Sequence, residues 1–480
     1  MNAILLRSLF LASFAGLALA QNAIPTHKIG NVVVSGSFRT RLEAWDWFPS
    51  TNDNAYGLSG NILRVSFAQT KENFDWNVEL AVPFLLGLPE RAQGTGAQGA
   101  LGLGSNYYTA NQRNRNAAML FPKQAYVRWK SPKQSLRLGR FEYNDGSETT
   151  PKSPTLNALK NTRINQRLIG AFAWAHVGRS FDGLHYQYAK GNRNFTAVSA
   201  VPTRGVFQVD GWGWNQAAFG YGALTQMWGK GTHAADTRVF GLYYHDFRDV
   251  LKTDNRPLAV RQADVFSDVK IFTFGGHSVH AFTAKAATYD LLFWGAGQTG
   301  KWGKLDHRAG SFVAEAGVQP KLKFKPWIRG GYTYGSGDSN STDGKHGTFF
   351  QNLPTPRPFA RFPFFDMINN RDIFASLVLR PHAKWTISNE YHFLSLAQRN
   401  DLWYQGGGVF QPWTFGYAGR PSNGQQSLAD LYDVSVEWRT NARVTFTGYV
   451  GFADGKDVVK KLHSTGATGK FGYLEMTYRF

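Results

Sequence analysis

The last thirteen residues of the chain, 468–480, alternate between apolar and polar side chains with a period of two. One face carries Tyr478, Met476, Leu474 and Gly472, and the other carries Arg479, Thr477, Glu475 and Tyr473. Lys470 breaks the apolar face, but it lies at the far end of the segment, where a long side chain reaches water at a membrane surface. This pattern fits the closing strand of an outer-membrane barrel and also a half-buried strand of a soluble sandwich.

Three segments near the N-terminus favour the barrel. In the segment 31–45, one face carries Val34, Phe38 and Leu42, and the opposite face carries Arg39, Arg41 and Glu43. An arginine that faces lipid at the bilayer midplane costs about 2–4 kcal/mol, so the charged face is expected to line a water-filled lumen. The segments 58–70 and 74–84 repeat the alternation, and the first of them places Arg64 in the lumen.

Further strands are predicted at 124–130, 135–143, 166–178, 181–190, 193–201, 216–228, 236–248, 264–274, 277–289, 308–319, 324–335, 370–380, 383–394, 430–440 and 442–452. The pattern is weakest at 193–201. Together with 31–45, 58–70, 74–84 and 468–480 these segments number nineteen. Single-chain bacterial barrels have even strand numbers, so the sequence predicts an all-β, antiparallel transmembrane barrel of about eighteen strands, within a range of about 16–20.

The connections between these strands alternate in length. Long polar connections are predicted at 88–116, 144–165, 335–369 and 397–427, and short turns at Gly275-Gly276, 320–323, 381–382 and 440–441. Outer-membrane barrels have long extracellular loops and short periplasmic turns. No plug domain is expected, because the first strand begins soon after residue 20. The aromatic-rich segment 349–365 is expected either to fold into the channel mouth or to anchor its loop at the barrel rim.

The N-terminus indicates export. Arg7 precedes an apolar run, 8–20, that ends in Ala18-Leu-Ala20, which predicts a signal peptide over 1–20 and a single barrel over 21–480. The thirteen-residue run is short for a membrane-spanning helix, which needs about twenty residues. Since later segments are too polar to form such a helix, a membrane location requires a barrel in the outer membrane of a Gram-negative bacterium.

Composition and charge narrow the choice of partners. The chain has a formal net charge of +20 and no cysteine, and 15% of its residues are aromatic. A basic protein binds anions, but export removes it from most nucleic acid, and no basic recognition helix is visible. The expected partners are an anionic polysaccharide or a small anionic solute, together with outer-membrane lipids and lipopolysaccharide.

Several short motifs resemble a known family. They are Leu136-Arg-Leu-Gly-Arg140 with Asn144-Asp-Gly146 behind it, Arg167-Leu-Ile-Gly170, and Gly178-Arg-Ser-Phe-Asp-Gly183. In this order the chain is similar to the alginate export family of outer-membrane channels over about residues 30–480. The resemblance implies a monomeric barrel with an arginine-lined pore that passes a polyanionic polysaccharide outward, in contact with periplasmic export components. It adds Arg140, Arg167 and Arg179 as candidate pore residues.

The candidate pore-lining residues are therefore Arg39, Arg41, Glu43, Arg64, Arg128, Arg140, Arg167, Arg179 and Arg439. Guanidinium groups stay charged and bind carboxylates in a forked geometry, and rings of them select anions. An alternative is that these arginines pair with acids to hold the barrel interior together. The candidate acids are Glu43, Glu79, Glu142 and Glu437.

Enzyme and cofactor motifs are incomplete. The segment 295–301 has the spacing of a phosphate-binding loop, but Trp302 replaces the magnesium-binding Ser or Thr, and Asp343 replaces the required glycine of a calcium loop. No catalytic residue, cofactor or metal is predicted. The sequence thus predicts a channel that exports an anionic, alginate-like polysaccharide. The alternative is an anion-selective uptake porin for small carboxylates or sugar acids, and a third class is a barrel enzyme with a dispersed Ser, His and Asp set.

Overall fold

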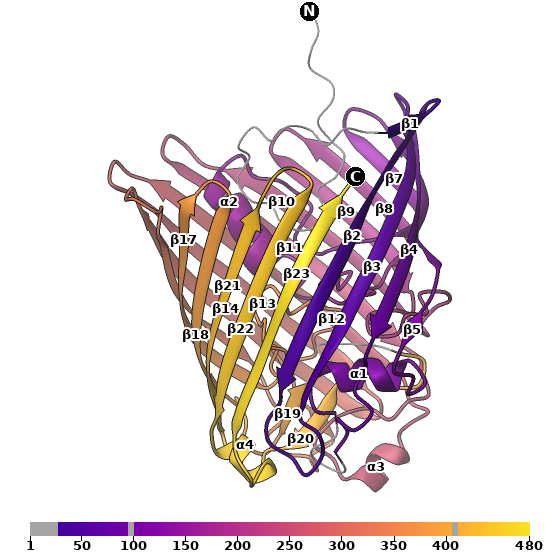
Figure 1. The fold of residues 1–480 in the computed structure, drawn as a ribbon, viewed down its shortest axis with the longest axis vertical. Helices are drawn as coiled ribbons and strands as arrows, with labels where there is room; N and C mark the ends of the chain where they lie inside the picture. The colour runs from indigo at the N-terminus through magenta and orange to yellow at the C-terminus, as the bar shows by residue number, and fades with distance from the viewer. Residues whose placement is uncertain (1–26, 95–99, 406–410) are drawn as a thin grey trace, which may run out of the picture.

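A computed structural model of the chain describes residues 27–94, 100–405 and 411–480. Within these residues, eighteen long antiparallel strands form one closed β-barrel (Figure 1). The fold class and the strand number expected from the sequence are confirmed. The predicted signal peptide lies outside the described residues, and no helix among those described is long and apolar enough to cross a membrane.

The barrel strands are β2 (Val32–Asp46), β3 (Ala55–Thr70), β4 (Phe74–Leu86), β6 (Phe121–Lys130), β7 (Gln134–Phe141), β8 (Phe181–Lys190), β9 (Arg193–Pro202), β10 (Ala217–Trp228), β11 (His233–Asp246), β12 (Val269–Thr283), β13 (Ala287–Trp302), β14 (Leu305–Pro320), β15 (Trp327–Gly335), β17 (Asn370–His382), β18 (Trp385–Ser395), β21 (Ser427–Arg439), β22 (Val444–Gly455) and β23 (Thr468–Arg479). Three short strands extend the same sheet: β1 (His27–Ile29), β5 (Ala117–Ala118) and β16 (Lys345–His346). A separate hairpin is formed by β19 (Leu402–Gln405) and β20 (Ala418–Pro421).

The barrel closes where its first and last long strands meet. β2 and β23 pair antiparallel from Ser37 opposite Arg479 to Asp46 opposite Lys470. Beyond this ladder, the Gly36 amide donates to the Phe480 carbonyl at 2.7 Å, and the Phe480 amide donates to the Gly36 carbonyl at 3.0 Å. Closure leaves no open sheet edge at this seam, which is the condition for a sheet to cross a bilayer.

The two ends of the barrel differ. The end that holds the C-terminus has short turns such as 71–73, 131–133 and 191–192, whereas most connections at the other end are long (Figure 1). The exception is the tight turn 303–304. The helices lie in the long connections and are α1 (Leu103–Ala110), α2 (Pro154–Leu159), the π-helix η1 (Lys160–Ile164), α3 (Leu258–Gln262) and α4 (Asp457–Leu462). By the usual asymmetry of these barrels, the long loops mark the extracellular end.

The alternation predicted from the sequence is visible in the exposure of the side chains. Leu42 on β2 and its partner Leu474 on β23 are 60% and 69% exposed on the outer surface, whereas Arg41 is 2% exposed. Lys470 lies on the outer face near the loop end and pairs with Asp46 at 3.0 Å. The outer face therefore presents large apolar side chains to lipid, and the charged side chains point inward.

The strand predicted at 166–178 and the turn predicted at Gly275-Gly276 are wrong. The segment 166–178 is not a strand but part of the 142–180 connection. Gln166 and Phe172 have left-handed φ angles, which interrupt a regular strand. The backbone hydrogen bonds of the segment go to Asp145 in the same connection and to Leu353 and Thr355 in another, and not to a neighbouring strand ladder of the described chain. The apolar alternation arose instead because this connection is buried inside the barrel.

The Gly275-Gly276 pair does not form a turn and lies in the middle of β12. A Cβ atom on Gly275 would approach the Gly295 carbonyl to 2.2 Å, and one on Gly276 would approach the Arg238 carbonyl to 2.4 Å. Glycine is required there because neighbouring strands approach closely. The strands predicted at 264–274 and 277–289 are replaced by β12 and β13, and the weakly patterned segment 193–201 does form a strand, β9.

The lipid-facing assignment of β23 is testable by substitution. Leu474→Arg places a charge near the middle of the strand on the outer face, and we expect it to lower the free energy of unfolding by about 2–4 kcal/mol. The measurement is urea unfolding of the barrel in phospholipid vesicles. Thr468→Arg, on the same face at the loop end, is the matched control and is expected to cost less than about 1 kcal/mol. Equal effects of the two substitutions would contradict the assignment.

Candidate functional site: the loop-filled lumen

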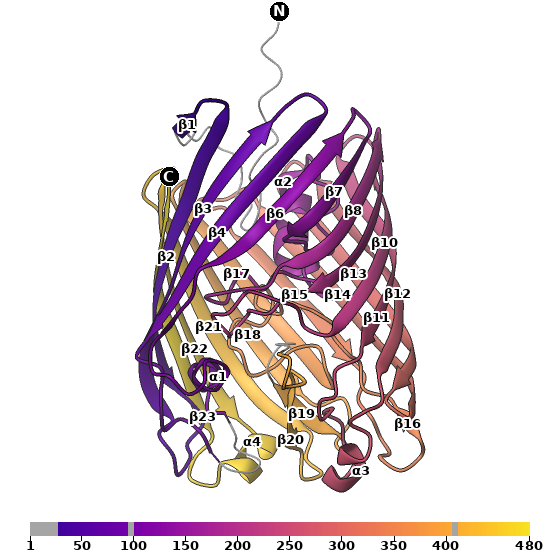
Figure 2. The same ribbon diagram turned by 90° about the vertical axis from the view of Figure 1, so that its right-hand side faces the viewer.

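The interior of the barrel is occupied by its own long connections. The 142–180 connection follows the short strand β7 and turns inward, so that α2 lies within the cylinder in both views (Figures 1 and 2). Its helical part begins at Ser153, whose hydroxyl accepts a hydrogen bond from the Leu156 amide at 3.5 Å, with Pro154 at the first helical position.

The 142–180 and 336–369 connections are joined to each other inside the barrel. Ile169 and Leu353 form a parallel bridge, in which the Gly170 amide donates to the Leu353 carbonyl at 2.7 Å and the Leu353 amide donates to the Leu168 carbonyl at 2.8 Å. The amide of Thr355 continues this contact by donating to the carbonyl of Gln166 at 2.9 Å. The two connections therefore form one hydrogen-bonded unit across the lumen.

A third connection, 396–426, packs against this unit. The Trp403 indole donates to the Phe364 carbonyl at 2.7 Å, and the Tyr417 hydroxyl donates to the Gln351 carbonyl at 2.7 Å. A cavity lined by Tyr417, Phe350 and Trp302, among others, has about 10 Å³, which is room for about one water molecule. The segment 349–365 was expected either to fold into the channel mouth or to anchor its loop at the barrel rim. The packing of this segment inside the barrel agrees with the first expectation.

The predicted residues of β2 form an ion-pair cluster with the closing strand. Arg41 lies 2.7 Å from Glu475 and 3.4 Å from Glu43, and Arg39 lies 3.7 Å from Glu475. Glu43 also lies 2.8 Å from His176 of the 142–180 connection, and Arg39 donates to the carbonyls of Ala173 and Ala175. The cluster therefore attaches this connection to the barrel seam.

The other strand arginines are also paired. Arg64 binds both Glu79 at 2.5 Å and Glu142 at 2.9 Å, and Arg128 binds Asp75 at 2.6 Å. Arg140 forms a forked pair with Asp182, with both contacts at 2.7 Å, and Arg439 lies 2.7 Å from Glu437. An arginine partner is thus present for all four acids that were expected to pair with arginines in the barrel interior, which are Glu43, Glu79, Glu142 and Glu437.

Exposure to water separates the predicted arginines into two groups. Five of the side chains, those of Arg39, Arg64, Arg128, Arg140 and Arg439, keep between 12% and 29% of their surface exposed. Arg41, Arg167 and Arg179 are at most 2% exposed. Arg167 donates to the Arg163 carbonyl at 2.6 Å and Arg179 to the Pro354 carbonyl at 3.0 Å, so both hold connections together.

The residues that fasten the 142–180 connection to the opposite wall were not among the predicted site residues. Arg163 forms a forked pair with Glu315 on β14, at 2.8 Å, and Glu315 also binds Arg329 on β15 at 2.7 Å. Arg163 further lies 4.3 Å above the ring of Phe374. Glu315 stands among the apolar residues of β14 on its inward face, which was the available signal.

A second missed cluster lies at the start of the same connection. Arg238 on β11 is fully buried and binds Asp145 at 3.3 Å and Glu148 at 3.1 Å. Lys160 binds Asp236 at 3.1 Å, and Asp236 accepts from His277 at 2.7 Å. Asp145 also accepts the amides of Leu168 and Ile169 at 3.0 Å, so the Asn144-Asp-Gly146 motif fixes the fold of the connection.

Two of the buried carboxyls in the connections have pKa values raised to near neutral pH. Burial raises the pKa of Asp366 to about 7, against the opposing effects of the Ile368 amide and Arg357. Burial likewise raises the pKa of Asp401 to about 6, although Thr348 and Tyr404 donate hydrogen bonds to it. The connections that occupy the lumen therefore contain groups that titrate near neutral pH.

The chain has recognisable relatives. The sequence model of the family described as "Alginate export" matches residues 34–467. A comparison with curated proteins finds no match.

Many solved structures are similar in fold. Acinetobacter baumannii OccAB2 has a TM-score of 0.56 at 9% identity, over 94% of this chain and 98% of that one. Pseudomonas aeruginosa OccK2 (OpdF) in complex with glucuronate has a TM-score of 0.56 at 7% identity, over 94% and 98% of the two chains. Pseudomonas aeruginosa OpdK with vanillate has a TM-score of 0.54 at 10% identity, over 93% and 98%.

Breaking the Arg163–Glu315 pair is expected to make the 142–180 connection more mobile. Removing one partner of a buried ion pair costs about 3–5 kcal/mol, and the lower end applies because Arg329 still compensates Glu315. Arg163→Ala is expected to raise hydrogen exchange of the 154–169 segment roughly a hundredfold, which corresponds to about 3 kcal/mol. Lys152→Ala, at an exposed position of the same connection, is the control. Unchanged exchange in Arg163→Ala would contradict the role of the pair.

The raised pKa of Asp366 predicts that pH controls the stability of the 349–367 segment. A carboxyl with a higher pKa in the packed state binds more protons there, so packing is favoured below about pH 4 and that advantage is lost as the pH rises through about 7. Protection of the segment against hydrogen exchange, corrected for the intrinsic rate, is expected to fall between pH 5 and pH 8. Asp366→Asn should reduce this fall in protection. The reduction should correspond to a free energy of segment opening on the order of a few kcal/mol.

The matched control is Asp343→Asn, since Asp343 is an exposed carboxyl in the same connection. It is expected to leave the pH dependence unchanged. A wild-type segment with equal protection at the two pH values would refute the assignment to Asp366.

Proposed function

The chain belongs to the alginate export family, and we propose that this outer-membrane channel passes small carboxylate anions, such as sugar acids, one at a time through a narrow path beside the packed connections. The observation that carries the proposal is the hydrogen-bonded unit of the 142–180 and 336–369 connections. A constriction of this kind suits a single small anion, whereas a polymer chain needs a wide path.

The ligands of similar barrels support the same solute class. OccK2 was crystallised with glucuronate and OpdK with vanillate. Both compounds are small carboxylates. A guanidinium group binds such a ligand through two parallel hydrogen bonds, which fixes its orientation.

The partly exposed arginines are proposed to line the path. Arg39, Arg64, Arg128, Arg140 and Arg439 each present part of a guanidinium group to water, and each is already paired with an acid. The acids weaken the hold of any single site on an anion, and conduction requires sites that bind weakly enough to release the solute. Arg41, Arg167, Arg179 and Glu43 are proposed to position the connections that shape the path.

Export of an anionic polysaccharide is the second candidate, because the family description names alginate export. It requires the 142–180 and 336–369 connections to leave the lumen, and it implies periplasmic export components as partners. A passive channel acts in the direction of the gradient, so the width of the path, rather than its direction, distinguishes the two candidates.

The remaining sequence expectations belong to the same proposal. They are a signal peptide over 1–20, a single barrel over 21–480, a monomer in contact with lipopolysaccharide and lipids of a Gram-negative outer membrane, no nucleic-acid partner, and no catalysis.

The proposal predicts anion selectivity that depends on the exposed arginines. In planar bilayers, the wild-type channel should prefer chloride over potassium. The triple variant Arg39→Ala, Arg64→Ala and Arg128→Ala should lower this preference about three- to tenfold, which corresponds to about 0.6–1.4 kcal/mol. Glucuronate should pass and should reduce the chloride current, whereas alginate chains should not pass.

The control is Arg308→Ala, because Arg308 is exposed on the outer face of β14. It should leave selectivity unchanged. Cation preference in the wild type would overturn the anion channel. Passage of alginate chains would instead favour the polysaccharide candidate, with selectivity retained.

A further inference from the structure

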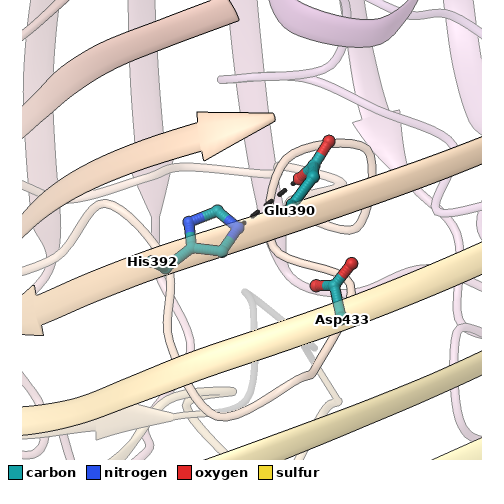
Figure 3. Close-up of side chains that lie close together, drawn as sticks. All are labelled: Glu390, His392 and Asp433. Carbon is teal, nitrogen blue, oxygen red and sulfur yellow. Dashed lines mark ion pairs between the residues drawn. The ribbon is translucent and has the colours of Figure 1, made fainter. Parts of the chain in front are cut away.

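A cluster of three potential metal ligands lies on the inner face of the wall, next to the Arg163–Glu315 pair, and the Phe374 ring between them lies 5.9 Å from the ring of His392. Glu390 and His392 stand two residues apart on β18, and Asp433 lies on the neighbouring strand β21 (Figure 3). One ligand atom from each residue lies within 4.8 Å of the others, and all three residues are buried. The parity of the two strands brings all three side chains to the same side of the sheet.

The two carboxylates face each other across the strand pair. Glu390 and Asp433 occupy directly opposed positions in the β18–β21 ladder. Like charges at such positions repel, because their side chains are among the closest neighbours in a sheet. Both carboxylate oxygens of Asp433, and Oε2 of Glu390, are buried without a hydrogen-bond partner among the described residues. An ionised carboxylate in that state is unfavourable unless a cation compensates its charge or it takes up a proton.

His392 is oriented as a metal ligand. Its Nδ1 atom lies 3.0 Å from both carboxylate oxygens of Asp372 on β17, which fixes the ring and places the proton of a neutral imidazole on Nδ1. In a neutral imidazole the Nε2 atom then carries the lone pair. It lies 3.4 Å from Oε2 of Glu390 (Figure 3), a contact that is an ion pair when His392 is protonated. A carboxylate behind the histidine is the usual support of a histidine that binds a metal ion.

The charges around the cluster match a divalent cation. Asp372, Glu390 and Asp433 contribute three negative charges, and Arg361, which acts electrostatically on Glu390 and Asp433, contributes one positive charge. Arg361 donates to the hydroxyl of Ser435 at 2.6 Å. Arg163 also acts on Glu390 but is held by Glu315 at 2.8 Å. With neutral His392, the net charge is −2.

We propose that Glu390, His392 and Asp433 bind a divalent transition-metal ion, for which Zn²⁺ is the test probe. One imidazole nitrogen and two carboxylate oxygens are ligands that Zn²⁺ accepts, and three protein ligands leave a fourth position for water or an anion. The ion joins β18 to β21 beneath the 349–367 segment, where the Phe365 ring lies 5.6 Å from the ring of His392. This site is independent of the transported solute.

The rival explanation is a doubly paired imidazolium, in which protonated His392 binds Asp372 and Glu390 without a metal. It leaves Asp433 with the electrostatic effects of Arg361 and His392 but without a cation that is hydrogen-bonded to it. The two explanations differ in the behaviour of Asp433→Asn, because this substitution removes a ligand from the metal site but leaves both partners of an imidazolium in place.

The test uses the full-length barrel in detergent, stripped with a chelator, dialysed and then titrated with ZnCl₂. We expect about one tightly bound Zn²⁺ per chain by elemental analysis and calorimetry, and a higher unfolding temperature with Zn²⁺. Asp433→Asn and His392→Gln should each weaken binding at least about tenfold, as loss of a ligand does. Replacement of Zn²⁺ by Co²⁺ should give a visible absorption band that His392→Gln removes.

His277→Gln is the matched control, because His277 is also a buried inner-wall histidine with a carboxylate partner, Asp236 at 2.7 Å. It should leave Zn²⁺ binding unchanged. Heat-modifiable migration in electrophoresis verifies that each variant forms a barrel. No stoichiometric Zn²⁺ uptake by the wild type would overturn the proposal, and so would uptake that Asp433→Asn and His392→Gln leave unchanged.

Discussion

The hydrogen-bonded seam between β2 and β23 is the constraint on which the other features of this protein depend. In lipid, each unpaired backbone group costs several kcal/mol, so a sheet can span the membrane only when its edges are joined. The pairing of Gly36 with Phe480 completes that seam at the C-terminal end. Once the sheet is closed, each strand has one lipid face and one interior face. The alternation of side chains then places apolar groups against lipid and charged groups in the interior.

The side chains on the interior face also hold the long connections in place inside the wide barrel. Buried ion pairs do this from several sides, with Arg41 and Glu43 at the seam, Arg238 on β11 and Glu315 on β14. A buried pair contributes little net stability, but breaking it is costly because one charge is left uncompensated. The pairs therefore fix where the connections lie more than they stabilise the barrel.

This arrangement changes how the net charge of +20 relates to function. The predicted arginines do not form a row of free charges, since those on the strands are paired with acids and Arg167 and Arg179 are buried among the connections. In the proposed channel, anion selection depends on the guanidinium groups that keep some contact with water, which are those of Arg39, Arg64, Arg128, Arg140 and Arg439. We propose that such a pore attracts anions without binding them tightly.

Much of the fold could be predicted from the sequence because strand parity is a local property. The residue after Arg41 faces lipid simply because successive side chains point to opposite faces, and the charges of Arg39 and Glu43 decide which face is wet. The same reasoning placed Arg64, Arg128 and Arg439 on the interior. Parity gave a wrong prediction at Gly275-Gly276, where glycine is needed because neighbouring strands approach closely. It was also wrong at 166–178, where a buried connection has the apolar alternation of a strand.

The candidate site could be predicted only in part, because its contacts join residues far apart in the chain. Arg163 and Glu315 are 152 positions apart, and Asp433 meets Glu390 only through the register of β18 and β21. The sequence by itself determined the closed barrel, its lipid face and its charged interior, since these follow from alternation and the cost of charge in lipid. Only the tertiary structure decided which charges pair and which connections fill the lumen, because both depend on the path of the chain through space.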